Sequence, residues 1–171
     1  MYVHDMHTVW ERLKDRVRIE VRPEEALLIR EYVFPVPPSI LWEYLTKPEY
    51  RVILLGASKL ELRNQVQGRT GVDSVFYCYH GKMETPQLIL DWHPFEQFTT
   101  DDANSWGVTT RITCKLEPTQ GGARLINLMG KPRGRGLRLM LFILLAKFVF
   151  AKQVAKSVEI LHQRILQDLA D

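Results

Sequence analysis

Apolar and polar residues alternate with a period of two along much of the chain. The clearest case runs from residue 108 to residue 116, where an inward set alternates with a polar set: Val108, Thr110, Ile112, Cys114 and Leu116 against Thr109, Arg111, Thr113 and Lys115. This pattern is typical of an antiparallel strand with one covered and one hydrated face. Six more segments have strand composition and are bounded by turn residues: 25–34, 58–64, 73–80, 87–93, 95–102 and 123–130. The chain therefore predicts a one-sided antiparallel sheet of about seven strands.

A helical period replaces the strand period at the C-terminus. From Leu137 onward, apolar residues recur in steps of three and four: Leu141, Leu144, Phe148, Ala151, Ala155, Val158, Ile165 and Leu169. The spacing predicts one long helix whose apolar stripe covers the sheet. Two short helices are expected after the first strand. Pro38 or Ser39 starts one that turns Ile40, Leu41 and Tyr44 toward the sheet, and Pro48 starts one with Val52, Ile53 and Leu55.

Residues 139–151 are apolar on nearly every face of the predicted helix, apart from Lys147. A basic, glycine-rich turn precedes them and contains Lys131, Arg133, Arg135 and Arg138. Three explanations are open for the second apolar face. The first and preferred one is packing inside the chain, the second is a homodimer interface, and the third is a transient contact with an anionic membrane surface.

Composition limits the class of protein. The chain has 171 residues, 46% of them hydrophobic, so a single core is expected. A formal net charge of +3 does not by itself favour nucleic-acid binding. The N-terminal segment lacks the pattern of a secretory signal, which makes the cytoplasm the expected location. Cys78 and Cys114 lack the spacing of a disulfide framework or zinc site, and we expect both to be buried, with no metal and no cofactor.

The predicted domains are a lead-in helix in residues 1–22 and one domain in residues 23–171. Met6, Trp10, Leu13 and Val17 set the helical spacing of the lead-in. The element order of the main domain, together with "VPPSILWEYLTKPEYR" and "LILDWHPFEQFT", resembles the START-like, Bet v 1-like or polyketide-cyclase (SRPBCC) superfamily. "GVDSVFYCYHG" with "LDWHPF" is similar to a bacterial branch of unknown function sometimes found beside nucleotide-cyclase domains.

The resemblance implies an α+β helix-grip fold, in which a curved antiparallel sheet surrounds a long C-terminal helix and two short helices close one end of the groove. It also implies an internal cavity for a hydrophobic or amphipathic small molecule such as a lipid or polyketide. The candidate ligand-binding residues are Tyr44, Tyr77, Tyr79, Leu90, Trp92, Thr110, Ile112, Asn127, Met140, Leu144 and Phe148. The inward face of segment 73–80 is left open between two sets: Val75, Tyr77 and Tyr79, or Phe76, Cys78 and His80.

Binding, with a role in transport or sensing, is the function that these patterns favour. One alternative is a cyclase or aromatase that uses His80 or a tyrosine hydroxyl, with Asp91 and His93 as further acid-base candidates. The sequence offers this alternative no nucleophile, metal triad or phosphate loop, so catalysis is the less favoured hypothesis. A second alternative is a regulatory module that docks another domain through the basic turn and the apolar helix.

Overall fold

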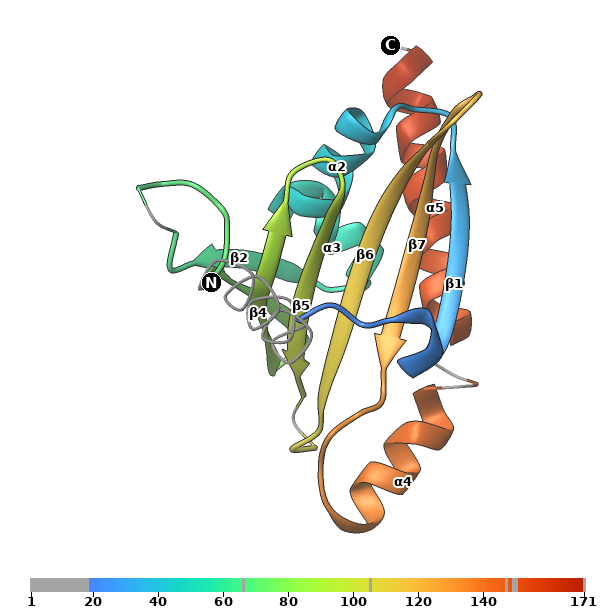
Figure 1. Ribbon diagram of the computed structural model, residues 1–171. Helices are drawn as coiled ribbons and strands as arrows, with labels where there is room; N and C mark the ends of the chain where they lie inside the picture. The colour runs from blue at the N-terminus through green and yellow to red at the C-terminus, as the bar shows by residue number, and fades with distance from the viewer. Residues whose placement is uncertain (1–18, 66, 105, 147, 149–150, 171) are drawn as a thin grey trace, which may run out of the picture.

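The computed structural model describes residues 19–170, except for residues 66, 105, 147 and 149–150. The predicted lead-in helix falls almost entirely on residues 1–18 and so lies outside the described residues. The described chain is α+β, with one seven-stranded sheet in the order β1-β7-β6-β5-β4-β3-β2 (Figure 1). Every neighbouring pair is antiparallel. The strands are β1 (Ala26–Phe34), β2 (Lys59–Arg63), β3 (Val75–His80), β4 (Met83–His93), β5 (Gln97–Ala103), β6 (Thr109–Thr119) and β7 (Gly122–Gly130).

Prolines set the two short helices between β1 and β2. Helix α2 (Pro38–Thr46) has Pro38 in its first turn, and helix α3 (Pro48–Leu55) has Pro48 in its first turn. Proline suits this position because its fixed φ is helical and the missing N–H would have no partner inside the helix. Lys47, which precedes Pro48, is extended and separates the two helices, as expected for a residue before proline. Gly56 ends α3 in the left-handed conformation with φ of 59°.

The concave face of the sheet is covered by α5 (Ala151–Ala170), which runs along β7 and β1 in Figure 1. A short 3₁₀ turn, η1 (Pro23–Glu25), leads into β1. The main core lies between α2, α5 and the sheet, and its fully buried members include Phe34, Leu41, Leu45, Phe98, Leu125, Leu161 and Ile165. Tyr44 is buried here as predicted, but Ile40 is 43% exposed. Trp42 and Leu45 are buried on the inner side of α2 in its place.

The predicted long C-terminal helix is present as α5, but the apolar run before it belongs to a second helix, and residues 147 and 149–150 between the two lie outside the described residues. The structure has two helices, α4 (Gly136–Leu145) and α5, and α4 lies beyond the end of the sheet while α5 covers it (Figure 1). The predicted stripe is correct at Val158 and Ile165, but Ala155 and Leu169 are exposed. Leu161, which was not assigned to the stripe, is fully buried.

Helix α4 packs through one face only, which corrects the preferred explanation for its apolar sequence. Phe142 is buried against Val108, with Leu139 and Trp106 beside it. The other face remains exposed, and we call it the α4 apolar surface: Leu137, Met140, Leu141, Leu144 and the following Phe148, each between 47% and 78% exposed. Packing inside the described chain therefore does not cover these side chains.

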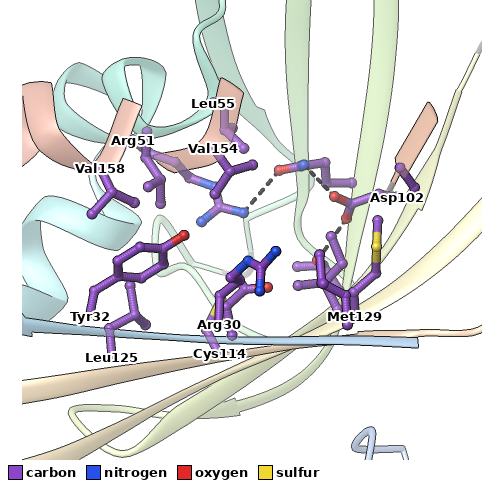
Figure 2. A pocket seen from close by; sticks show the side chains of 17 residues that line it. Arg30, Tyr32, Arg51, Leu55, Asp102, Cys114, Leu125, Met129, Val154 and Val158 are labelled. Atoms are coloured by element: carbon purple, nitrogen blue, oxygen red, sulfur yellow. Dashed lines mark hydrogen bonds between the residues drawn. The ribbon is translucent and has the colours of Figure 1, made fainter. Parts of the chain in front are cut away.

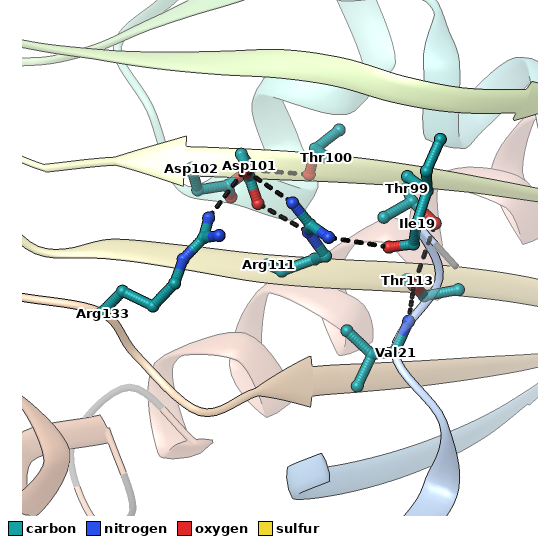
Figure 3. Close-up of polar contacts among 9 residues, drawn as sticks. All are labelled: Ile19, Val21, Thr99, Thr100, Asp101, Asp102, Arg111, Thr113 and Arg133. Atoms are coloured by element: carbon teal, nitrogen blue, oxygen red, sulfur yellow. Dashed lines mark hydrogen bonds and ion pairs between the residues drawn. The ribbon is translucent and has the colours of Figure 1, made fainter. Parts of the chain in front are cut away.

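The convex face of the sheet carries a polar network that holds the segment before β1 (Figure 3). Asp101 accepts hydrogen bonds from Arg111 Nε at 2.9 Å and from Arg133 Nη2 at 2.7 Å. Arg111 also donates to the backbone oxygen of Ile19, and the Val21 amide donates to Thr113 Oγ1 at 2.8 Å. The predicted hydrated face of β6 is thus partly covered by residues 19–21.

Candidate functional site: a cavity between α5 and the sheet

The main cavity lies between the sheet, α3, α4 and the start of α5, and has a volume of about 470 Å³. This volume is within the usual range of small-molecule sites. The cavity is mostly apolar, with a few polar groups among its lining residues: Leu54, Leu55, Cys78, His80, Met83, Thr85, Gln87, Asp102, Ala103, Asn104, Trp106, Thr110, Ile112, Met129, Phe142, Gln153, Val154 and Ser157. Helix α3 forms part of this wall, whereas α2 contributes no lining residue and fills the core.

A smaller inner cavity of about 110 Å³ adjoins the main one. Both cavities are lined by Leu54, Leu55, Gln87, Asp102, Ile112, Met129 and Val154. The inner cavity reaches β1 and β7, and its own lining is Leu28, Arg30, Tyr32, Arg51, Thr100, Cys114, Leu125, Asn127, Ala146 and Val158. The two spaces together form one site with a wide apolar chamber and a narrow end that carries cationic and hydroxyl groups.

Arg51 is the central polar group of the inner cavity. It lies on α3 and is 3% exposed. Its Nη1 donates to the Leu45 backbone oxygen at 2.8 Å and its Nη2 donates to Gln87 Oε1 at 2.9 Å. The guanidinium also lies over the rings of Phe76 and Phe98, at 4.6 Å and 5.2 Å from their centroids. These contacts fix the cation at the boundary between α3 and the concave face.

Asp102 completes a partly buried chain of hydrogen bonds that begins at Arg51. Gln87 Nε2 donates to Asp102 Oδ2 at 2.6 Å, and the Thr100 hydroxyl donates to Asp102 Oδ1 at 2.7 Å. Burial raises the pKa of Asp102 to about 6, while the two hydrogen bonds and the positive charge of Arg51 act in the opposite direction. Gln87 separates the two charged groups, so Arg51 and Asp102 are linked without direct contact (Figure 2).

Three buried side-chain polar atoms have no hydrogen-bond partner among the described residues: Tyr32 Oη, Arg51 Nε and Thr110 Oγ1. Tyr32 and Arg51 line the inner cavity, and Thr110 lines the main one. A buried polar group without a partner is costly, and native proteins have few of them. Their concentration around one space indicates that the space is suited to a molecule with polar groups.

Both cysteines are buried and unpaired, as the sequence predicted, and each lines part of the site. Burial raises the pKa of Cys78 to about 12 and that of Cys114 to about 11. Since the thiolate is the nucleophilic form, neither cysteine is activated for covalent chemistry at neutral pH.

The predicted ligand-binding residues fall into two groups. Thr110, Ile112 and Asn127 line the site. The other predicted residues lie outside the lining: Tyr44, Tyr77, Tyr79, Leu90, Trp92, Met140, Leu144 and Phe148. Tyr44 donates to Asp168 Oδ2 at 2.6 Å and joins α2 to α5. Trp92 packs against Trp42 and Phe98 in the core. Met140, Leu144 and Phe148 belong to the exposed α4 apolar surface.

The register of β3 resolves the open alternative in favour of Phe76, Cys78 and His80. Cys78 and His80 line the main cavity, and Phe76 is fully buried under Arg51. Tyr77 and Tyr79 lie on the opposite face, where Arg63 stacks on the Tyr77 ring and donates to the Tyr79 hydroxyl. Leu90 lies at the register shift between Ile89 and Asp91 in β4.

His80, Asp91 and His93 do not form one acid-base group. His80 pairs with Met83 at the turn between β3 and β4, whereas His93 pairs with Gln97 at the far end of β4. Met83 and Asp91 are separated by roughly 26 Å of extended strand, at about 3.3 Å per residue. His93 Nε2 lies 3.0 Å from Asp91 Oδ1 at an exposed rim, away from the site.

Sequence reasoning missed Arg51, Gln87, Asp102 and Tyr32 as members of the site. The sequence did offer one signal for Arg51. Arg51 lies three residues before Leu54, so in a helix the two side chains share one face, and a cation on the apolar face of a short helix is unusual. Asp102 and Gln87 require the register of β4 against β5, which pairs them directly. That pairing depends on the bulge in β4 and is not visible in the sequence.

Among the described residues, no group of three or more His, Cys, Asp or Glu side chains is placed to hold a metal ion. The same residues include no helix with the length and apolar character needed to cross a membrane.

Comparison with protein-family models and with curated proteins finds no match. Solved structures do match. A protein from Mesorhizobium loti is 21% identical over 80% of this chain and 96% of that chain, with a TM-score of 0.57. One from Nitrosomonas europaea is 14% identical over 88% of this chain and 100% of that chain, with a TM-score of 0.61. DynU16, from the dynemicin biosynthetic locus, is 13% identical over 77% of this chain and 46% of its own, with a TM-score of 0.53. At these identities the likeness shows a shared fold, that of a curved antiparallel sheet with a C-terminal helix.

Proposed function

We propose that the chain is a START-like, Bet v 1-like domain that binds an amphipathic small molecule, of the lipid or polyketide class, between α5 and the sheet. The observation that carries the proposal is the 470 Å³ apolar chamber joined to a narrow end with unpartnered polar atoms. Burial of apolar ligand surface contributes about 25 cal/mol per Å², and a few polar groups fix the orientation. The presence of DynU16, from a biosynthetic locus, among the matching structures is compatible with this proposal.

A variant that fills the chamber tests the proposal. Ile112 lines both cavities, so Ile112→Trp places an indole in the ligand space. The control is Ile126→Trp on the adjacent strand β7, where Ile126 pairs with Lys115 and faces the opposite side of the sheet. Binding is measured by displacement of 1-anilinonaphthalene-8-sulfonate with dodecanoic acid and with dodecan-1-ol.

We expect saturable binding of at least one probe to the wild type, weakened about tenfold or more by Ile112→Trp, a change of about 1.4 kcal/mol, and unchanged by Ile126→Trp. Failure of both probes to bind the wild type, or an equal loss in the two variants, would contradict the proposal.

The cyclase or aromatase hypothesis has less structural support than the binding hypothesis. His80 lines the main cavity, but the carboxylate and second histidine expected beside it lie at the other end of β4. Tyr32 is the tyrosine whose hydroxyl faces the inner cavity, in place of Tyr77 or Tyr79. Binding therefore has more support than turnover.

A second candidate function, contact with an anionic membrane, is favoured by the α4 apolar surface. Lys131, Arg135 and Arg138 are exposed beside it, and no ion pair joins them to another described residue. Apolar side chains next to cations match the interface of an anionic bilayer. A second copy of the chain would instead bring the same cations to the contact. Phe142, on the packed face of α4, lines the main cavity, so a membrane here would lie next to the ligand space.

Vesicle sedimentation tests this contact. The wild type should sediment with phosphatidylcholine vesicles that contain phosphatidylserine, less at high salt, and far less as Leu141→Glu/Leu144→Glu. Ile160→Glu is the control, because Ile160 is 50% exposed on α5, outside the α4 apolar surface. Equal sedimentation with and without phosphatidylserine would contradict the proposal. A dimer that Leu141→Glu/Leu144→Glu dissociates would assign the surface to a second copy.

A further inference from the structure

Resting on the proposed binding function, we propose that the ligand carries an acidic group of the carboxylate class, held in the inner cavity by Arg51 and Tyr32. The apolar part of the same molecule then occupies the main cavity.

The first argument is the state of Arg51. Its side chain is 3% exposed, and its hydrogen bonds go to a backbone carbonyl and an amide, both neutral acceptors. No carboxylate of the described residues forms an ion pair with it. Its Nε has no acceptor among the residues that the structure describes. A buried cation needs an opposite charge or a complete set of acceptors, and a ligand carboxylate would supply both.

The second argument is the position of Tyr32 on β1. Its hydroxyl is buried and has no partner among the described residues. Figure 2 shows the Tyr32 hydroxyl and the guanidinium groups of Arg30 and Arg51 directed into the same space. A phenol hydroxyl can donate to a carboxylate oxygen, so one anion could satisfy Tyr32 Oη and Arg51 Nε together.

Charge gives the third argument. The lining of the inner cavity contains the buried guanidinium of Arg51, the solvent-exposed guanidinium of Arg30 and one carboxyl group, Asp102. With Asp102 ionised the charges sum to two minus one, or +1, so the lining is net positive and favours an anionic ligand group over a neutral one. Asp102 does not satisfy these donors: its oxygens accept from Gln87 and Thr100, and no hydrogen bond joins it to Arg51 Nε or Tyr32 Oη among the described residues.

The test compares two probes of equal chain length at pH 8, dodecanoic acid and dodecan-1-ol, by the same displacement assay. The acid should bind the wild type about tenfold or more tightly than the alcohol, because hydrogen bonds to charged groups are stronger than neutral ones. Tyr32→Phe removes one hydroxyl and keeps the ring in the core, whereas an Arg51 variant could lose the fold. Tyr32→Phe should therefore weaken the acid about fivefold to tenfold and leave the alcohol unchanged. Tyr77→Phe, on the opposite face, should change neither.

Equal binding of acid and alcohol by the wild type, or an equal loss of both in Tyr32→Phe, would overturn this inference and leave the proposed function in place. Binding of neither probe would overturn the proposed function and the inference with it.

Discussion

At the scale of single residues, two adjacent aspartates show how strand geometry sets chemistry. Burial alone would raise the pKa of Asp101, but hydrogen bonds from Arg111 and Arg133 outweigh it and hold the pKa below its usual value. Asp102 points to the concave face, where burial raises its pKa to about 6. The adjacent pair of aspartates in the sequence predicts neither pKa shift, since each shift depends on the face of the sheet that the side chain occupies.

The raised pKa of Asp102 predicts a pH dependence of stability. Because the folded state binds this proton more tightly, the stabilising contribution is complete below about pH 4 and is lost as the pH rises through about 6. The loss is at most about 3 kcal/mol, for a pKa that moves from 3.8 to about 6. Asp102→Asn, which cannot titrate, should lack this loss in urea unfolding measured from pH 4 to pH 7.

Asp101→Asn is the matched control for that measurement. A lowered pKa gives stability that is present above the ordinary value and lost only as the pH falls through the lowered one. Between pH 4 and pH 7, the difference between Asp101→Asn and the wild type should therefore stay nearly constant. Parallel profiles for the wild type and Asp102→Asn would show that Asp102 titrates normally.

At the scale of helices and strands, the alternation of apolar and polar residues and the positions of the prolines correctly predicted the strands and the two short helices. All seven strands appear within a few residues of their predicted ranges, and both short helices begin at the predicted prolines. The division between α4 and α5 could not be predicted, because residues 139–151 are so uniformly apolar that every direction of the helix gives a similar stripe. Because α4 lies beyond the sheet and does not cover it, its second apolar face stays exposed as the α4 apolar surface.

The turn between β6 and β7 offers a sharp test of the element packing. A Cβ on Gly122 would lie 2.0 Å from the Phe34 backbone oxygen, and φ at this residue is 154°. Gly122→Ala should therefore cost about 3 kcal/mol or more of unfolding free energy. Its neighbour Gly121 has nothing within 4 Å of a Cβ, so Gly121→Ala should stay within about 0.5 kcal/mol of the wild type. Similar melting temperatures for the two variants would contradict the close approach of β1 to this turn.

At the scale of the whole molecule, the sequence pattern predicted a one-sided antiparallel sheet covered by a C-terminal helix, and the resemblance to the START-like superfamily implied that the sheet is curved. The sequence did not predict where the two cavities lie or most of the residues that line them. The chamber depends on the register of β3 and on the angle at which α3, α4 and α5 meet the sheet, and these are long-range contacts. A ligand space is the part of a fold that packing leaves open, so hydrophobic pattern alone cannot separate it from core.

A ligand bound between α5 and the concave face would contact methyl groups that line the two cavities. The most direct test of this binding is a methyl NMR titration of the labelled protein with dodecanoic acid. We expect chemical-shift changes and ligand contacts at the methyl groups of Leu54, Ile112 and Val154, which line both cavities. The methyl groups of Val33, which is 62% exposed, and Ile126, which lies on the convex face of β7, should not respond. Shifts confined to those outer methyl groups or to the α4 apolar surface, or no shifts at all, would show that the ligand does not bind between α5 and the sheet.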